Sequence, residues 1–135
     1  SQNKFVPYEA KVQLSGTIVE LYYTSSDFTI GANSTIILVP MNLHSEYKEI
    51  WAQIRWSESV ASWSINAHPH RNISGSGAGF DAVPIVTENT MDKYRGYGKL
   101  SLSEDMPNPI YSIRLTNRTD NDAQVVAIGV WGVKW

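Results

Sequence analysis

Five polar and aromatic side chains near the middle of the chain have the chemistry of a sugar-binding site. Sugars present apolar C–H patches and rings of hydroxyl groups, so a site for them combines an aromatic platform with planar hydrogen-bonding groups. The predicted ligand-binding residues are Trp51, Gln53, Arg55, Asn66 and His68. The alternative is that a loop or a neighbouring subunit buries Trp51, because tryptophan is also enriched in protein interfaces.

Metal chemistry is a weaker interpretation of the same region. His44, His68, His70 and Asp81 could supply ligands, but no HExxH or comparable spacing accompanies them. Solvent-facing imidazoles at a proline-bent strand end explain these histidines better. The run from 120 to 122 is rich in oxygen ligands but lacks the EF-hand pattern, so we interpret it as a hairpin turn. The sequence predicts neither a metal nor a cofactor.

Catalysis ranks third among the functions considered. The chain has no cysteine for a thiolate nucleophile and no G-x-S-x-G motif, and its glycine-rich stretch from 74 to 79 lacks the lysine of a phosphate loop. Glu46, Glu49 and Glu58 could pair as the carboxylates of a glycoside-processing enzyme. Charge at strand ends is ordinary, however, so no catalytic residue is predicted.

The chain length and the net charge further limit the class of protein. The 135 residues suit one domain spanning 1–135, large enough to bury a real core. A net charge of −2 with scattered basic residues argues against a nucleic-acid partner. No apolar run approaches the roughly 20 residues of a membrane span, and no leader remains at Ser1. We therefore expect a soluble protein of undetermined compartment, with secretion or a virion or cell surface as suitable settings.

The elements that must position the candidate site read as strands separated by turn residues, without a helix. Period-two alternation places Ile50, Ala52, Ile54 and Trp56 on one face, with Trp63, Ile65 and Ala67 on the corresponding face of the next run. A hairpin through Ser57–Val60 would set Trp51 opposite Asn66 and keep every apolar residue on one side. That hairpin is what would bring the five site residues together.

Other segments complete an all-β pattern. Lys11–Tyr23 changes parity near Ser15-Gly16, which predicts a β-bulge, and Ser34–Met41 is apolar on both parities, which favours a central strand ending at Pro40. Asn72–Gly79 is predicted to be a long loop. Further strands are expected at Phe80–Val86, Gly96–Ser103, Pro109–Thr116 and Gln124–Trp135, with a polar hairpin loop at Asn117–Asp122.

The last of these strands is apolar on both parities, so one of its faces must be covered. Val125, Ala127, Trp131 and Val133 alternate with Val126, Ile128 and Val130. In a sandwich the second face can lie against a neighbouring protomer, and we therefore predict a homo-oligomer, with a trimer as one closed arrangement, that forms through the C-terminal strand.

About eight short strands with Gly/Pro-rich turns predict a two-sheet antiparallel β-sandwich or jelly roll, with an eight-stranded β-barrel as the alternative. In architecture such a chain is similar to small jelly-roll lectins and to the trimeric heads of phage receptor-binding proteins. The predicted function is non-catalytic carbohydrate binding, with oligomerisation supplying avidity for glycans in recognition or adhesion. The alternative is a structural or receptor-binding head of a virion, phage tail or surface assembly.

Overall fold

A computed structural model describes residues 17–39, 47–69, 82–87, 94–102 and 110–135 of the chain. All regular elements in these ranges are β-strands. No helix in these ranges is long and apolar enough to cross a membrane. The strands are β1 (Ile18–Thr24), β2 (Phe28–Ile30), β3 (Thr35–Val39), β4 (Tyr47–Trp56), β5 (Trp63–Pro69), β6 (Val83–Thr87), β7 (Arg95–Ser101), β8 (Ile110–Asn117) and β9 (Ala123–Lys134).

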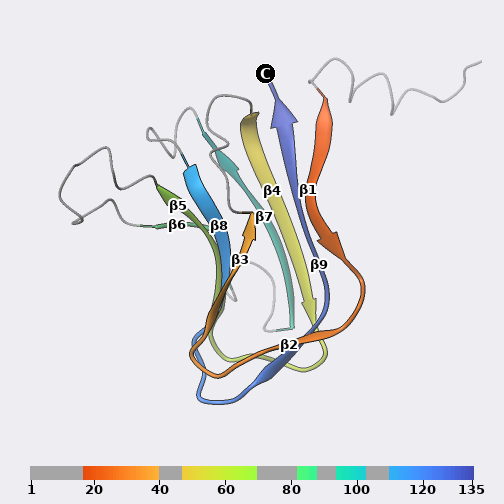
Figure 1. Cartoon of the computed structure of the whole chain (residues 1–135), viewed down its shortest axis with the longest axis vertical. Helices are drawn as coiled ribbons and strands as arrows, with labels where there is room; N and C mark the ends of the chain where they lie inside the picture. The colour runs from red at the N-terminus through yellow and green to blue at the C-terminus, as the bar shows by residue number, and fades with distance from the viewer. Residues whose placement is uncertain (1–16, 40–46, 70–81, 88–93, 103–109) are drawn as a thin grey trace, which may run out of the picture.

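The strands form two antiparallel sheets that face each other (Figure 1). The first sheet has the order β1-β9-β4-β7, with β2 also paired to β9, and the second has the order β3-β8-β5-β6. The pairing is nested along the chain, because β1 pairs with β9, β3 with β8, β4 with β7, and β5 with β6. A long hairpin rolled into two layers pairs in this way, and the predicted jelly-roll sandwich is confirmed; the sheets do not close into a barrel.

The core lies between the sheets and contains the side chains that the alternation assigned to it. Along β4, the residues at even positions from Ile50 to Trp56 are buried while Trp51, Gln53 and Arg55 are exposed. From β5, Trp63 packs against Trp56 of the opposite sheet, with 5.8 Å between ring centroids. The sheets also approach closely at Gly98, where a Cβ atom would lie 2.3 Å from the backbone oxygen of Ile85.

The predicted hairpin between the runs at 50–56 and 62–68 is wrong. β4 pairs with β7 and β9, whereas β5 pairs with β6 and β8 in the other sheet. The link Ser57–Ser62 therefore crosses between layers instead of turning within one. Apolar faces with period two can meet face to face across a core as well as lie side by side, so alternation alone does not choose between the two arrangements.

Two further expectations need correction. In the described residues β3 pairs only with β8, and Ile37 is 53% exposed, so β3 is not a central strand covered on both sides. The loop from 118 to 122 joins β8 in one sheet to β9 in the other, so it is polar as predicted but is not a hairpin. Buried Asn117 organises this crossing: its Nδ2 donates to the backbone oxygens of Gly31 (3.1 Å) and Asn121 (2.8 Å).

The C-terminal strand β9 is apolar on both parities partly because it contains a bulge. Arg55 pairs with Ala127 but Trp56 pairs with Val125, so Val126 is an extra residue. The bulge lets Val125 and Ile128 both reach the core, although they differ in parity. The other described strands begin or end within a few residues of their predicted bounds, at 18–24, 83–87, 95–101 and 110–117.

Several predicted features lie outside the described residues. They are the bulge at Ser15-Gly16, Pro40, His44, Glu46, His70, the loop Asn72–Gly79 and Asp81.

Candidate functional site

The outward face of the first sheet carries three parallel rows of side chains that run across its strands. The tryptophan row consists of Glu20, Trp131, Trp51 and Lys99. The glutamine row consists of Tyr23, Gly129, Gln53 and Tyr97. The arginine row consists of Ala127, Arg55 and Arg95. Neighbouring rows are two residues apart along β4, β7 and β9, or roughly 7 Å. On β1 they are three residues apart, because the register shifts between Glu20 and Tyr22.

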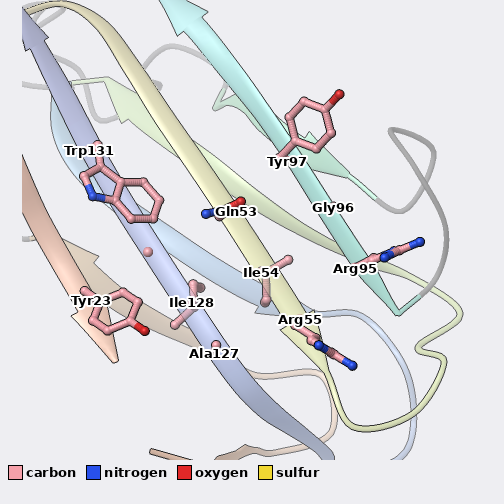
Figure 2. Close-up of a pocket in the computed structure, with 11 residues that line it drawn as sticks. Tyr23, Gln53, Ile54, Arg55, Arg95, Gly96, Tyr97, Ala127, Ile128 and Trp131 are labelled. Atoms are coloured by element: carbon pink, nitrogen blue, oxygen red, sulfur yellow. The ribbon is translucent and has the colours of Figure 1, made fainter. Parts of the chain in front are cut away.

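A groove of about 390 Å³ follows the glutamine and arginine rows and is open to solvent (Figure 2). Tyr23 and Tyr97 stand at its two sides, on β1 and β7. A smaller depression of about 210 Å³ adjoins it between Trp51, Gln53, Tyr97 and Trp131. The two hollows share Gln53, Tyr97 and Trp131, so they form one continuous surface.

Trp131 lies across its own strand because residue 129 is glycine. A Cβ atom on Gly129 would be 2.2 Å from Cη2 of the Trp131 indole, far inside van der Waals contact, so only glycine leaves room for the ring. The indole therefore leans from the tryptophan row over the glutamine row, toward Gln53 (Figure 2). Tyr23 packs beside it, with 6.5 Å between ring centroids and 44° between planes. The result is an aromatic surface fixed at the edge of the groove.

Trp51 is held by a small polar cluster at the other end of its row. Its Nε1 donates to Glu49 Oε1 at 3.1 Å, and Lys99 Nζ lies 3.3 Å from Glu49 Oε2 and 5.5 Å from the indole centroid. Burial alone would raise the pKa of Glu49, but the hydrogen bonds from Trp51 and Lys99 and the charges of Lys99 and Lys48 outweigh it and lower the pKa. Glu49 is therefore ionised at neutral pH and already paired.

The structure divides the predicted site between the two sheets. Trp51, Gln53 and Arg55 share the outward face of the first sheet, as predicted. Asn66 and His68 belong to β5 and alternate with its core residues, so they lie on the opposite side of the sandwich and do not join the other three.

Asn66 and His68 occupy a different environment from an open binding surface. Asn66 is buried, and its Nδ2 donates to Ser64 Oγ at 2.8 Å. Burial, followed by the charge of Arg114, lowers the pKa of His68, so its imidazole is neutral at pH 7. In the described part of the chain, no group of three or more His, Asp or Glu side chains is placed to hold a metal ion.

Sequence reasoning missed four residues of this surface, namely Tyr23, Arg95, Tyr97 and Trp131. They come from β1, β7 and β9, and only strand pairing across the sheet brings them beside β4. One local signal was present: Gly129 and Trp131 are two residues apart and so share a face, with the glycine leaving space for the ring.

No protein-family model matches the chain, and no curated protein matches it in sequence. Among solved structures it is similar to chitosan-binding module 1 of a chitosanase/glucanase from Paenibacillus sp. IK-5, with 11% identity, a TM-score of 0.45, and coverage of 90% of this chain and 98% of that one. A selenomethionine-labelled mutant of that module gives 12% identity and 0.43, covering 90% and 97%.

A protein of the disulfide-linked pili that form Bacillus endospore appendages gives 10% identity and a TM-score of 0.40, covering 88% of this chain and 90% of that one. Similarities this distant do not bear on what the present chain binds.

Proposed function

We propose that this protein is a non-catalytic carbohydrate-binding module and that the groove on the outward face of its first sheet is the sugar site. The observation that carries the proposal is the indole of Trp131, which lies over Gly129 beside Gln53. An aromatic ring fixed at the edge of an open groove can stack on the apolar face of a sugar, and an adjacent amide can bind its hydroxyls.

The rest of the surface supports the same ligand class. Tyr23 and Tyr97 are about half exposed and can combine ring contacts with hydroxyl hydrogen bonds. Trp51 extends the aromatic area into the adjoining depression. The groove volume of about 390 Å³ falls in the usual range of small-molecule sites, roughly 300–1,000 Å³, and its open shape suits an extended chain of sugar units.

The groove favours binding over hydrolysis. Glycoside hydrolysis uses two carboxyl groups that flank the scissile bond, and none of the described residues that line the groove is Asp or Glu. Glu49, on the neighbouring tryptophan row, is already engaged by Trp51 and Lys99.

Self-association through β9 would compete with this site. Within the described residues, β9 is hydrogen-bonded to β1 and β2 along one edge and to β4 along the other, so a second copy could reach it only through its outward side chains. Those include Ala127, Gly129 and Trp131, which line the groove. An oligomer that multiplies sugar sites for avidity or adhesion must therefore use another surface, whereas a structural head of an assembly could use this one.

A glycan array followed by calorimetry with Trp131→Ala tests the proposal. We expect wild-type binding to at least one glycan class, and a loss of that binding in the variant without a large change in melting temperature, since Trp131 lies outside the core. Trp135→Ala is the matched control, because Trp135 is 66% exposed and does not line the groove.

Unchanged affinity in Trp131→Ala would reject the site. The absence of any glycan ligand, together with a sedimentation mass of several chains that falls in Trp131→Ala, would favour the protein-interface alternative.

A further inference from the structure

The sugar groove has a positively charged end. Arg55 and Arg95 are cross-strand partners on β4 and β7, and both line the groove (Figure 2). Like charges placed directly opposite each other on a sheet are unfavourable. Among the described residues that line the groove there is no carboxylate, so none of these side chains offers Arg55 a negative charge.

Arg55 differs from three other cations of the described residues, which have partners. Lys99 is paired with Glu49, the Arg114 Nε donates to Ser112 Oγ at 2.8 Å, and Arg118 donates to Ser64 Oγ. Within the described part of the chain, Arg55 has no hydrogen bond or ion pair and is exposed. Its guanidinium is therefore available to a ligand.

The positively charged end of the groove lies close to the Trp131 ring. The Trp131 indole leans over the glutamine row, and the arginine row is the next row along the strands, roughly 7 Å away. A ligand that stacks on Trp131 can thus place a substituent of the same or the adjoining sugar unit at Arg55. A guanidinium fork binds a planar carboxylate through two parallel hydrogen bonds, which a neutral hydroxyl cannot match.

We infer that the glycan bound in this groove is acidic: a uronic-acid-containing saccharide whose carboxylate contacts Arg55. This inference rests on the proposed function and adds the ligand class. The protein has a net charge of −2, so an attraction for polyanions must come from this local row and not from the molecule as a whole. A cationic glycan of glucosamine units is disfavoured at the same place.

The test compares acid and ester forms of the same sugar. Oligosaccharides of galacturonic, glucuronic and mannuronic acid, each with its methyl ester, are titrated calorimetrically into the full chain. For the preferred backbone we expect the acid to bind at least about tenfold more tightly than its ester. Arg55→Gln should reduce that difference to less than about twofold without lowering the melting temperature, and Arg55→Lys should restore only part of it.

Lys134→Gln is the control, because it removes the same charge at the far end of β9, beside Tyr47, outside the groove. It should leave the acid preference intact. Equal binding of acids and esters, or binding only of neutral glycans or of sulfated ones, would overturn the acidic ligand and leave the sugar site standing. Binding of no glycan at all would reject the proposed function itself, and the acidic ligand with it.

Discussion

Gly129→Ala is the sharpest test of the groove, because it changes the position of the Trp131 ring without removing the ring. The new Cβ atom would lie 2.2 Å from Cη2 and 2.8 Å from Cζ2 and Cζ3 of the indole. Carbon atoms in contact are separated by at least about 3.5 Å, so the ring must move away by at least roughly 1.3 Å (3.5 minus 2.2). The indole is then lifted from its place over the glutamine row.

Gly129→Ala should lower the affinity for sugar because it disrupts stacking on the Trp131 ring. An aromatic contact contributes about 0.5–1.5 kcal/mol beyond buried area, so sugar binding should weaken by about 2- to 12-fold. Stability should change by less than about 1 kcal/mol. The displaced atoms are the far end of a side chain, and replacing an extended glycine by alanine gains about 0.4–1 kcal/mol through the unfolded state, which offsets part of the cost.

Calorimetric titration with the best array ligand measures the affinity, and thermal unfolding followed by circular dichroism measures the stability. Trp131→Ala in the same series shows how much of the effect belongs to the ring itself. If Gly129→Ala bound the ligand as tightly as wild type while its tryptophan emission showed that the indole had moved, the position of the ring over the glutamine row would be irrelevant to binding. Trp131 would then not be the platform on which the sugar stacks.

Three further outcomes are expected. Gly98→Ala should destabilise the fold by about 1–3 kcal/mol and lower the melting temperature, because its Cβ would lie 2.3 Å from a backbone oxygen of the opposite sheet. A loss of stability as small as that of Gly129→Ala would contradict the close approach of the two sheets. Asn117→Ala should cost about 1–3 kcal/mol in urea unfolding, because it removes the buried amide that donates to the backbone oxygens of Gly31 and Asn121. Asn121→Ala keeps the accepting backbone oxygen and should cost much less. Burial lowers the folded-state pKa of His68 below its ordinary 6.5, so the unfolded chain takes up a proton first as the pH falls. The free energy of unfolding should therefore decline below about pH 6.5. An unaltered pH profile in His68→Gln would count against this residue as the cause.

The sequence by itself determined the faces of the strands. Side chains alternate along any strand, so the apolar positions of the run at 50–56 had to face a core, and Trp51, Gln53 and Arg55 had to face away from it. Composition and turn residues likewise sufficed for an all-β sandwich, because no segment has the period of a helix.

Only the tertiary structure decided which strands are neighbours. Two strands with apolar faces satisfy the same pattern whether they pair edge to edge or pack face to face about 10 Å apart, and β4 and β5 do the latter. That choice separates Asn66 and His68 from Trp51 and replaces them with Tyr97 and Trp131, which come from strands distant in sequence.

In β9, one extra residue shows why the sequence alone could not assign side chains to the correct face of a strand. A single bulge at Val126 changes which side chains face inward, so parity counted along the sequence could not place Val125 and Trp131 on their correct sides. Such a bulge is stabilised by the pairing of β9 with β4 and by the packing of both against the second sheet. Interactions between segments far apart in the chain therefore decide the position of the aromatic ring on which the proposed site depends.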